Sequence, residues 1–259
     1  MIKLIASDVD GTLVKDGEGR LDKKMVEAIR AIHAKGIHFA VASGRQWISI
    51  ENVFEDVKEK IFYISDNGAY IGINGRTLFI SKMEDLVARD LVIDIRKNKN
   101  LIAVVADASS YYIEVENFAL MDWIRNGYRG RVELVKDLTE IKDIIKISAY
   151  CDNIYGKADD IIKKYTDKLL VNYAGTMWLD CTAKGVSKGV ALKKLQEAFD
   201  IKENETLVFG DQANDVEMFE AAYYSFAVKN AAAVAKQAAK FEADSVENSG
   251  VLKILNYLL

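Results

Sequence analysis

The chain has 259 residues, of which half are hydrophobic, 10% are aromatic and 29% are charged. This composition is typical of a globular protein and is long enough for one large or two smaller domains. The formal net charge is −4 and no block rich in lysine and arginine occurs, so the sequence does not favour nucleic-acid binding.

Strand-like and helix-like patterns alternate over the first part of the chain. Apolar runs bounded by turn residues predict buried strands at 4–6, 37–43 and 61–65. Apolar residues at helical spacing predict helices at 46–57 and at 22–35, the latter with Val26, Ile29, Ile32 and His33 on one face. The stretch YIGINGRTLFI at 70–80 predicts a hairpin that turns at Asn74 and Gly75. This order indicates the start of a doubly wound parallel sheet.

The middle of the chain has many short strands and few helices. Strands are predicted at 101–107, 111–117, 131–137, 144–152, 168–175 and 177–183, and helices at 84–98 and 157–166. From Ser187 the alternation resumes, with helices at 187–199, 214–222, 231–240 and 250–258 and strands at 205–210 and 225–229. We therefore expect an α/β fold: a doubly wound parallel, Rossmann-like core formed by 1–82 and 185–259, with an α+β cap domain inserted at 83–184.

Unusual polar residues occur at four strand ends or helix starts of the predicted core. Ligands of an open parallel sheet bind beyond the carboxyl ends of its strands. The residues at these positions are Asp8, Asp10, Ser43, Gly44 with its backbone N–H, Arg45, Lys188, Asp211, Asn214 and Asp215. Each motif is weak alone, since such sequences also form plain turns or solvated faces, but the four together indicate one site.

These residue types suit phosphoryl transfer. Asp8 and Asp211 would hold a hard divalent cation, for which carboxylate oxygens are the natural ligands. The cation would screen Asp8 and Asp10 from each other, two like charges that are otherwise costly at a strand end. Asp8 would then attack phosphorus to form an aspartyl-phosphate, while Asp10 protonates the leaving oxygen and later activates water.

The remaining polar groups have supporting roles in this scheme. Gly11 would permit the sharp turn after Asp10, and Thr12 would orient Asp10 through a hydrogen bond. Asp215 is expected to support Lys188 or Asp211 rather than to bind the metal. Arg45 is either part of the phosphate site or a structural ion-pair partner. Charge on the transferring group would be collected by Ser43, the Gly44 N–H, Lys188 and Asn214.

The motifs DVDGTLV, ASGR, GVSKGVAL and GDQANDVEM resemble those of the haloacid dehalogenase superfamily, specifically its Cof-type phosphatases with a large α/β (type C2) cap. The resemblance covers both ends of the chain and places the cap between ASGR and GVSKG. One departure is Ser43, where threonine is commoner in the family, and serine keeps the hydroxyl. The segment SDNGAYI at 65–71 is similar to a further family segment that lies near the substrate.

The resemblance implies a Mg²⁺-dependent phosphatase that hydrolyses small phosphate monoesters, mostly sugar phosphates, through an aspartyl-phosphate. It implies that Asp8 is the nucleophile and Asp10 the general acid and base, and that Asp8, the Asp10 backbone carbonyl and Asp211 bind Mg²⁺. The other implied site residues are Val9, Ser43, Gly44, Lys188 and Asn214 for phosphate binding, Thr12, Arg45 and Asp215 as support, and Asn67 and Gly68 near the substrate.

The predicted cap would select the substrate. Aromatic side chains could offer faces to a sugar, although they more often pack a core; the candidates are Tyr111, Tyr112, Trp123, Tyr128, Tyr173 and Trp178. Arg125, Arg129 and Arg131 in NGYRGRV could meet an anionic substrate, although a solvated loop is the commoner structure for such a segment.

Other functions are weighed against this hypothesis. A phosphomutase with the same core and cap would need a second phosphate site in the cap, which the arginine cluster leaves open. A non-catalytic phosphate-sensing module would be expected to lack Asp10 or Lys188, and both are present. A nicotinamide-binding domain is disfavoured because no G-x-G-x-x-G motif follows the first strand.

Histidine and cysteine usage narrows the chemistry further. His33 and His38 are the two histidines and are expected to be structural, which disfavours a His base or a multi-His metal site. Cys151 and Cys181 lack metal-binding or disulfide-framework spacing.

No apolar run reaches the roughly 20 residues of a membrane span, and no signal peptide is expected. We expect a cytoplasmic monomer or small homo-oligomer acting on a small phosphorylated metabolite, with no nucleic-acid or membrane partner.

Overall fold

The structure is a computed structural model that describes residues 1–15, 20–127 and 130–259. The chain forms two compact units. The core unit comprises Met1–Phe79 and Ser187–Leu259, and the cap unit comprises Ile80–Val186. Each unit buries its own clusters of apolar side chains.

The core unit contains an eight-stranded sheet in the order β14-β13-β12-β1-β2-β3-β4-β5. Neighbouring strands from β14 to β3 are parallel, and β4 pairs antiparallel with β3. Strands β1, β3 and β12 are buried along their whole length, as expected for a parallel sheet covered on both faces. The strands are β1 Leu4–Asp8, β2 His38–Ala42, β3 Ile61–Ser65, β4 Tyr70–Ile73, β5 Arg76–Ile80, β12 Thr206–Gly210, β13 Tyr224–Val228 and β14 Phe241–Ala243.

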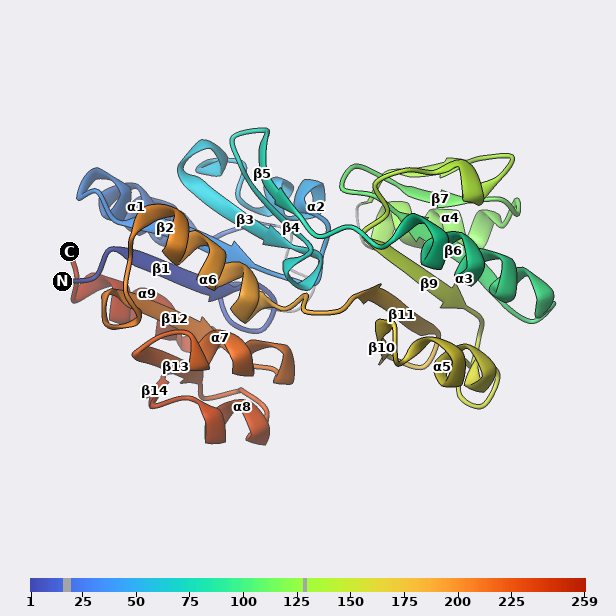
Figure 1. Ribbon diagram of the computed structural model, residues 1–259. Helices are drawn as coiled ribbons and strands as arrows, with labels where there is room; N and C mark the ends of the chain where they lie inside the picture. Colours follow the sequence, from blue (N-terminus) through green and yellow to red (C-terminus); the bar gives the residue numbers. More distant parts are fainter. Residues whose placement is uncertain (16–19, 128–129) are drawn as a thin grey trace. The chain divides into compact units, whose positions relative to one another are not determined.

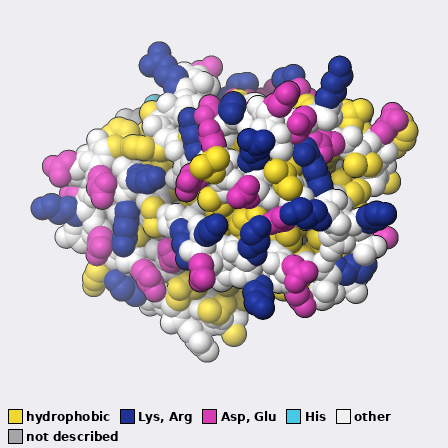
Figure 2. Space-filling model, turned by 45° about the vertical axis from the view of Figure 1, so that its right-hand side comes forward, with side chains coloured by type: hydrophobic (Ala, Val, Ile, Leu, Met, Phe, Trp, Pro, Cys, Tyr) yellow, Lys and Arg dark blue, Asp and Glu magenta, His cyan; other side chains and the backbone are white. Residues whose placement is uncertain are grey.

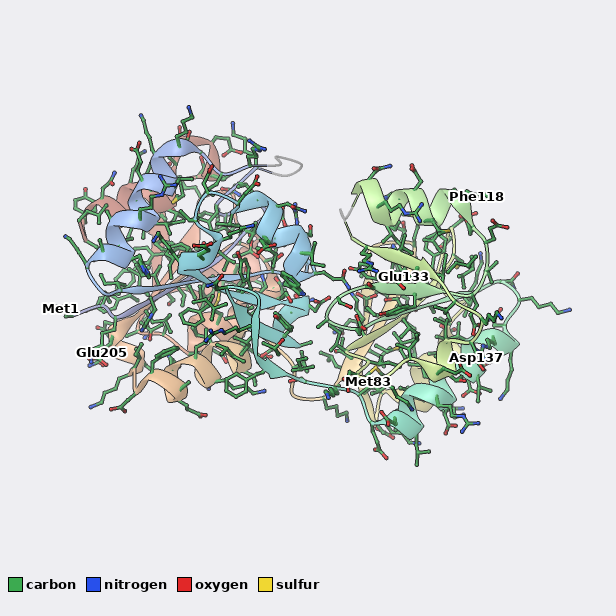
Figure 3. All side chains as sticks on the ribbon, turned by 90° about the horizontal axis from the view of Figure 1, so that it is seen from above. Met1, Met83, Phe118, Glu133, Asp137 and Glu205 are labelled. Atoms are coloured by element: carbon green, nitrogen blue, oxygen red, sulfur yellow. The ribbon has the colours of Figure 1, made fainter. Side chains whose placement is uncertain are left out.

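Helices cover both faces of this sheet (Figures 1 and 3). Helix α1 packs against α9, and α6 packs against α7. The helices of the core unit are α1 Lys23–Ala34, α2 Trp47–Val53, α6 Lys188–Phe199, α7 Val216–Glu220, α8 Ala233–Ala238 and α9 Gly250–Asn256. This layered arrangement confirms the predicted α/β fold with a parallel core sheet.

Several details differ from the sequence-based expectations. The helix predicted at 214–222 is a 3₁₀ turn, Ala213–Asp215, followed by the shorter α7, and strand β14 was not predicted. His33 is exposed and not on the buried face of α1. The hairpin turn is confirmed: Asn74 and Gly75 both adopt positive φ between β4 and β5.

The cap unit contains a six-stranded mixed sheet in the order β10-β11-β9-β6-β7-β8. Only the β7–β8 pair is parallel among the neighbours in this sheet that the structure describes. Its strands are β6 Ile102–Ala106, β7 Tyr111–Ile113, β8 Val132–Leu134, β9 Lys146–Tyr150, β10 Leu169–Ala174 and β11 Trp178–Ala183. Its helices are α3 Asp85–Lys97, α4 Phe118–Asp122 and α5 Asp159–Tyr165, with a π-helical turn at Trp123–Gly127.

Strand alternation divides the apolar residues of the cap unit between two clusters. On β6, Ala103 and Val105 join the cluster under α3 and α5, while Val104 and Ala106 join the cluster under α4. This is the two-residue period of a sheet buried on both faces. The apolar strands predicted in this region therefore form one sheet that has an apolar cluster packed on each face.

The aromatic candidates of the cap unit mostly serve packing. Trp123 and Trp178 stack with ring centroids 5.3 Å apart, and Trp178 is 6% exposed. Tyr111 is buried in the same cluster, whereas Tyr173 is exposed and contacts Tyr155.

The arginine cluster of the cap unit is only partly described. Arg131 forms an ion pair with Glu133, and Arg125 is exposed. Two of the predicted candidates, Tyr128 and Arg129, lie outside the described residues.

The surface mixes both signs of charge. Lysine and arginine side chains are interspersed with aspartate and glutamate over the face drawn in Figure 2, in agreement with the small net charge. Within the described ranges, none of the helices has the length and apolar character needed to cross a membrane.

Candidate active site

Polar side chains from three neighbouring parallel strands meet at one edge of the core sheet. Asp8 is the last residue of β1, Ser43 follows β2 directly, and Asp211 follows β12 directly. These strands are adjacent and parallel, in the order β12-β1-β2, so their carboxyl ends lie at the same edge. Lys188 enters from the first turn of α6, which is capped by the hydroxyl of Ser187. The structure therefore brings together residues that are far apart in the chain.

Lys188 joins two buried carboxylates. Its Nζ donates to Asp8 Oδ1 at 2.6 Å and to Asp215 Oδ1 at 2.7 Å, and the Lys188 side chain is only 1% exposed. Burial alone would lower the pKa of Lys188, but the charges of Asp8 and Asp215 outweigh it and raise that pKa. The lysine is therefore held in its charged form, and it is not the solvated surface residue that its residue type alone would favour.

Asp215 is the fixed partner in this arrangement. It is fully buried, and its Oδ2 accepts hydrogen bonds from the backbone N–H groups of Asp211 and Gln212 at 2.9 and 3.0 Å. Both of its carboxylate oxygens thus have protein donors. Asp215 therefore holds Lys188 and the backbone of Asp211 and Gln212 in place.

Asp211 is held against the turn that follows β1. Thr12 Oγ1 donates to Asp211 Oδ1 at 2.8 Å, rather than to Asp10 as expected, because the turn at Gly11 directs the threonine toward the end of β12. Gly11 has a φ of +79°, and a Cβ added there would lie 2.7 Å from Asp211 Oδ2. Glycine is thus required by both conformation and space.

The cluster has an excess of negative charge. Carboxylate oxygens of Asp8, Asp211 and Asp215 lie within 4.8 Å of one another, and Lys188 is the cation paired within this group. Three carboxylates and one ammonium leave a formal charge of −2. Burial raises the pKa of Asp8 well above the usual range of an aspartate, and Asp215 and Asp211 add to this effect. Burial likewise raises the pKa of Asp211.

These properties fit a bound divalent cation. A charge of +2 would balance the cluster, and carboxylate oxygens are the ligands that hard cations prefer. Asp8 and Asp211 are the better candidates to hold the ion. Asp215 is fully buried and already accepts three hydrogen bonds, whereas Asp8 and Asp211 are slightly exposed and accept one and two. The site is therefore a candidate metal site.

Asp10 lies outside this acidic group and has a partner of its own. Arg45 Nε donates to Asp10 Oδ2 at 2.8 Å, and Arg45 Nη2 contacts Asp10 Oδ1. Both side chains are partly exposed. Ser43, by contrast, is buried, and its Oγ accepts from the Arg45 N–H at 3.1 Å. Of the two roles considered for Arg45, the geometry favours the ion-pair partner.

The segment similar to the family's substrate-proximal sequence also reaches this edge. Asp66–Gly68 form a short turn with positive φ directly after β3. Asn67 Oδ1 accepts a hydrogen bond from Asn214 Nδ2 at 2.9 Å. Val9, another predicted site residue, has a fully buried side chain, so only its backbone could serve a ligand.

Some neighbouring residues were missed by the sequence analysis. Gln212 Nε2 donates to Asp211 Oδ2 at 3.0 Å, and Asn230 Nδ2 donates to the Gly11 carbonyl at 2.7 Å. Asn230 follows β13, so the rule that directed attention to the other strand ends applies to it equally. Glu217 accepts from the Ser187 hydroxyl, but its sequence context carries no comparable signal.

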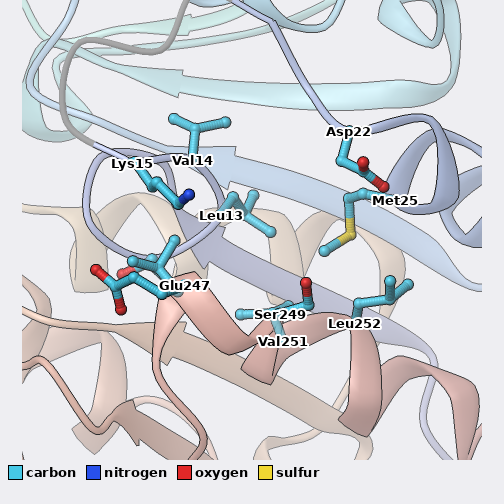
Figure 4. Close-up of a pocket in the computed structure, with 11 residues that line it drawn as sticks. Leu13, Val14, Lys15, Asp22, Met25, Glu247, Ser249, Val251 and Leu252 are labelled. Atoms are coloured by element: carbon cyan, nitrogen blue, oxygen red, sulfur yellow. The ribbon is translucent and has the colours of Figure 1, made fainter.

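A pocket of about 190 Å³ lies beside the turn that follows β1. It is bounded by the residues after β1, by the start of α1 and by α9 (Figure 4). Leu13, Val14 and Met25 contribute apolar surface, and Asp22 and Glu247 contribute charge. The carboxylates joined by Lys188 do not line it. The pocket is thus separate from the acidic cluster.

A family model described as haloacid dehalogenase-like hydrolase matches residues 5–255. The chain belongs to the haloacid dehalogenase-like hydrolases. The match confirms the family inferred from the four motifs, and it covers the cap unit as well as the core unit. The haloacid dehalogenase-like chain is accordingly a phosphatase, a hydrolase that acts on phosphate monoesters.

Known proteins are similar to this hydrolase over its whole length. A 5-amino-6-(5-phospho-D-ribitylamino)uracil phosphatase of Escherichia coli is 27% identical, covering 100% of this chain and 96% of its own. The Bacillus subtilis protein of the same name is 26% identical, with 99% and 95% coverage. A crystal structure from Eubacterium rectale is 33% identical, with a TM-score of 0.95 and coverage of 100% and 99%. These likenesses extend to both units.

Proposed function

We propose that this phosphatase hydrolyses small sugar or sugar-alcohol phosphates through an aspartyl-phosphate on Asp8, with Mg²⁺ as its cofactor. The observation that carries the proposal is the buried cluster at the end of β1, where Lys188 joins Asp8 to Asp215 and Asp211 lies beside them. The proposed nucleophile Asp8, the ammonium group of Lys188 and the candidate metal site thus lie within a few ångströms of one another at one edge of the sheet.

Asp8 would attack phosphorus in line with the leaving oxygen. A P–Oδ bond forms, the P–O bond to the substrate breaks, and Asp10 donates its proton to the leaving oxygen. Asp10 would then take a proton from a water molecule whose oxygen attacks phosphorus, which releases phosphate and restores Asp8. The ion pair with Arg45 holds the Asp10 carboxylate in one orientation, which suits the step in which Asp10 takes the proton from water.

Phosphate would be bound by groups at the same edge. Lys188 supplies a positive charge, and the other predicted ligands are the Val9 and Gly44 N–H groups, the Ser43 hydroxyl and the Asn214 amide. Fixed donors of this kind stabilise the charge that develops on the transferring group without reorganising during the reaction.

Mg²⁺ would be held by Asp8, the Asp10 carbonyl and Asp211. When bound, it would neutralise charge on the phosphate and on Asp8, which favours attack by one anion on another. The formal charge of −2 in the acidic group supports a divalent ion. Thr12 and Gln212 would orient Asp211 by the hydrogen bonds that they donate to its oxygens.

The substrate class is proposed from the relatives and from the core chemistry together. Two relatives are named for dephosphorylation of a ribityl phosphate linked to a pyrimidine. A phosphorylated sugar alcohol is therefore the first compound to test.

The test is phosphate release from p-nitrophenyl phosphate and from a panel of sugar and sugar-alcohol phosphates, in Mg²⁺ and in EDTA. We expect turnover in Mg²⁺, no turnover in EDTA, and a preference within the panel. A folded protein that releases phosphate from none of these esters in Mg²⁺ would overturn the proposal.

A further inference from the structure

The turn after β3 has a backbone that few residues adopt. Asp66, Asn67 and Gly68 have φ values of +49°, +55° and +102°. Aspartate, asparagine and glycine are the residues that best tolerate this left-handed region. The sequence Asp-Asn-Gly thus suits a conformation that the neighbouring contacts must hold in place.

Two backbone hydrogen bonds fix this turn to the segment that follows β2. The Asp66 N–H donates to the Arg45 carbonyl and the Asn67 N–H donates to the Ser43 carbonyl, each at 3.0 Å. The Asn67 amide also borders Gly44, because a Cβ added to Gly44 would lie 3.3 Å from both of its polar atoms. Asn67 is therefore packed directly on two predicted phosphate ligands.

The same turn lies against the start of α6. A Cβ added to Gly68 would lie 2.2 Å from the Ser187 carbonyl oxygen. Only glycine permits this approach, which places the turn beside the residue that precedes Lys188. The turn thus contacts the segments that carry Ser43, Gly44 and Lys188.

The Asn67 side chain adds a link to a fourth segment. Its Oδ1 accepts from Asn214 Nδ2 at 2.9 Å. Asn67 follows β3 and Asn214 follows β12, and the strand order β12-β1-β2-β3 places the end of β1, with Asp8, between them. At about 4.8 Å between neighbouring strands, this bond links loops from strands roughly 14 Å apart, across the edge that holds the nucleophile.

We infer that Asn67 is a positioning residue that orients the Asn214 amide toward the phosphate, an inference that rests on the proposed role of Asn214 as a phosphate ligand. Asn214 is exposed, so its amide would otherwise rotate freely. Its NH₂ group has two donors. The bond to Asn67 occupies one of them, fixes the plane of the amide and leaves the second donor for an anion.

The experiment is a double-mutant cycle read by the affinity for inorganic phosphate in the presence of Mg²⁺, using titration calorimetry. Asn67→Gly removes the amide without straining a left-handed backbone. Asn214→Ala removes its partner, and the double variant closes the cycle. Asn74→Gly is the matched control, because Asn74 has a φ of +49° in the hairpin turn and contributes nothing to the site.

Loss of one hydrogen bond predicts that Asn67→Gly weakens phosphate binding about three- to tenfold. Asn74→Gly should leave the affinity unchanged, and the double variant should bind no more weakly than Asn214→Ala alone. Asn67→Asp, which keeps the acceptor oxygen, should retain the coupling to Asn214. KM for an ester substrate should rise in Asn67→Gly and stay unchanged in Asn74→Gly.

Two results would overturn the inference. One is an unchanged phosphate affinity in Asn67→Gly. The other is a multiplicative loss in the double variant, which would mean that Asn67 binds the anion independently of Asn214. Because the cycle is read by binding, it is separate from the proposed function: an enzyme that binds phosphate with this coupling but hydrolyses no ester would contradict the reaction and leave the role of Asn67 intact.

Discussion

Arg45 forms a two-point ion pair with Asp10, the carboxylate two residues after the proposed nucleophile. The two groups come from the ends of adjacent strands β1 and β2. Guanidinium and carboxylate match in shape, so such a pair fixes the carboxylate in orientation as well as in charge. An acid and base that serves both halves of the reaction benefits from that constraint.

Arg45→Ala should lower kcat about tenfold or more, because charge-assisted hydrogen bonds of this kind are worth about 1.5–3 kcal/mol. Steady-state kinetics on p-nitrophenyl phosphate measure the effect. Arg20→Ala is the control, since Arg20 forms an exposed ion pair with Glu55 at 3.7 Å. Equal kcat values in the two variants would contradict the proposal that Arg45 orients Asp10 for catalysis.

Lys188→Met should lower the free energy of unfolding by about 3–5 kcal/mol, because it leaves two buried carboxylates without their cation. Urea denaturation in EDTA measures this loss. The double variant Lys188→Met/Asp215→Asn should recover part of the stability, since it removes one of the uncompensated charges. A single variant as stable as the wild-type protein would show that the lysine does not neutralise this cluster.

Mg²⁺ should stabilise the protein even without substrate. Binding to the folded state adds about 2.7 kcal/mol at a hundredfold excess over Kd, and the thermal midpoint should rise accordingly at matched ionic strength. Asp211→Asn should reduce the rise of the thermal midpoint in Mg²⁺ if the ion binds at this site. A rise caused by a general salt effect would be the same in this variant as in the wild-type protein. A midpoint that is the same in Mg²⁺ and EDTA would argue against the metal site.

Asp94 in the cap unit should make stability depend on acid pH. Burial opposes its ionisation, but hydrogen bonds from Lys164, Lys97 and Tyr165 lower its pKa to about 2. A lowered folded-state pKa contributes stability above the unfolded value of about 3.9, and this stability is lost as pH falls toward 2. Asp94→Asn should therefore cost about 1–2 kcal/mol at pH 7.

The cost of Asp94→Asn should shrink between pH 4 and 2. Denaturant unfolding at a series of pH values measures it, with Asp167→Asn as an exposed control from the same unit. A cost that stays constant down to pH 2 would mean that the ion pairs of Asp94 do not stabilise the fold.

The residues at strand ends were predictable because a topological rule locates them. Parallel order brings Asp8, Ser43 and Asp211 to one edge whatever the side-chain details. Lys188 was predicted as a phosphate ligand from its motif and not from its residue type, since most lysines are exposed; its burial was not predicted.

Other relationships depended on backbone details that periodicity does not encode. The Thr12 hydroxyl reaches Asp211 and not Asp10 because Gly11 adopts a left-handed turn. The Asn67–Asn214 hydrogen bond joins residues 147 positions apart. Nothing in the sequence around either residue predicts that the two side chains are in contact. Strand β14 was also missed, because its three residues include Glu242 and directly follow the helix predicted at 231–240.

The most direct test of the account is to look for a phosphoryl group on Asp8. The Asp10→Asn variant, in which hydrolysis of the intermediate should be slow, is mixed with Mg²⁺ and p-nitrophenyl phosphate, whose leaving group needs no proton from Asp10. The mixture is quenched in acid and digested with trypsin. We predict that mass spectrometry finds one added phosphoryl group on the peptide Leu4–Lys15, and that the group is absent when Asp8→Asn is also present. Rapid turnover by the wild-type enzyme with no phosphorylated peptide in the variant, or a phosphoryl group that persists with Asp8→Asn, would contradict Asp8 as the nucleophile.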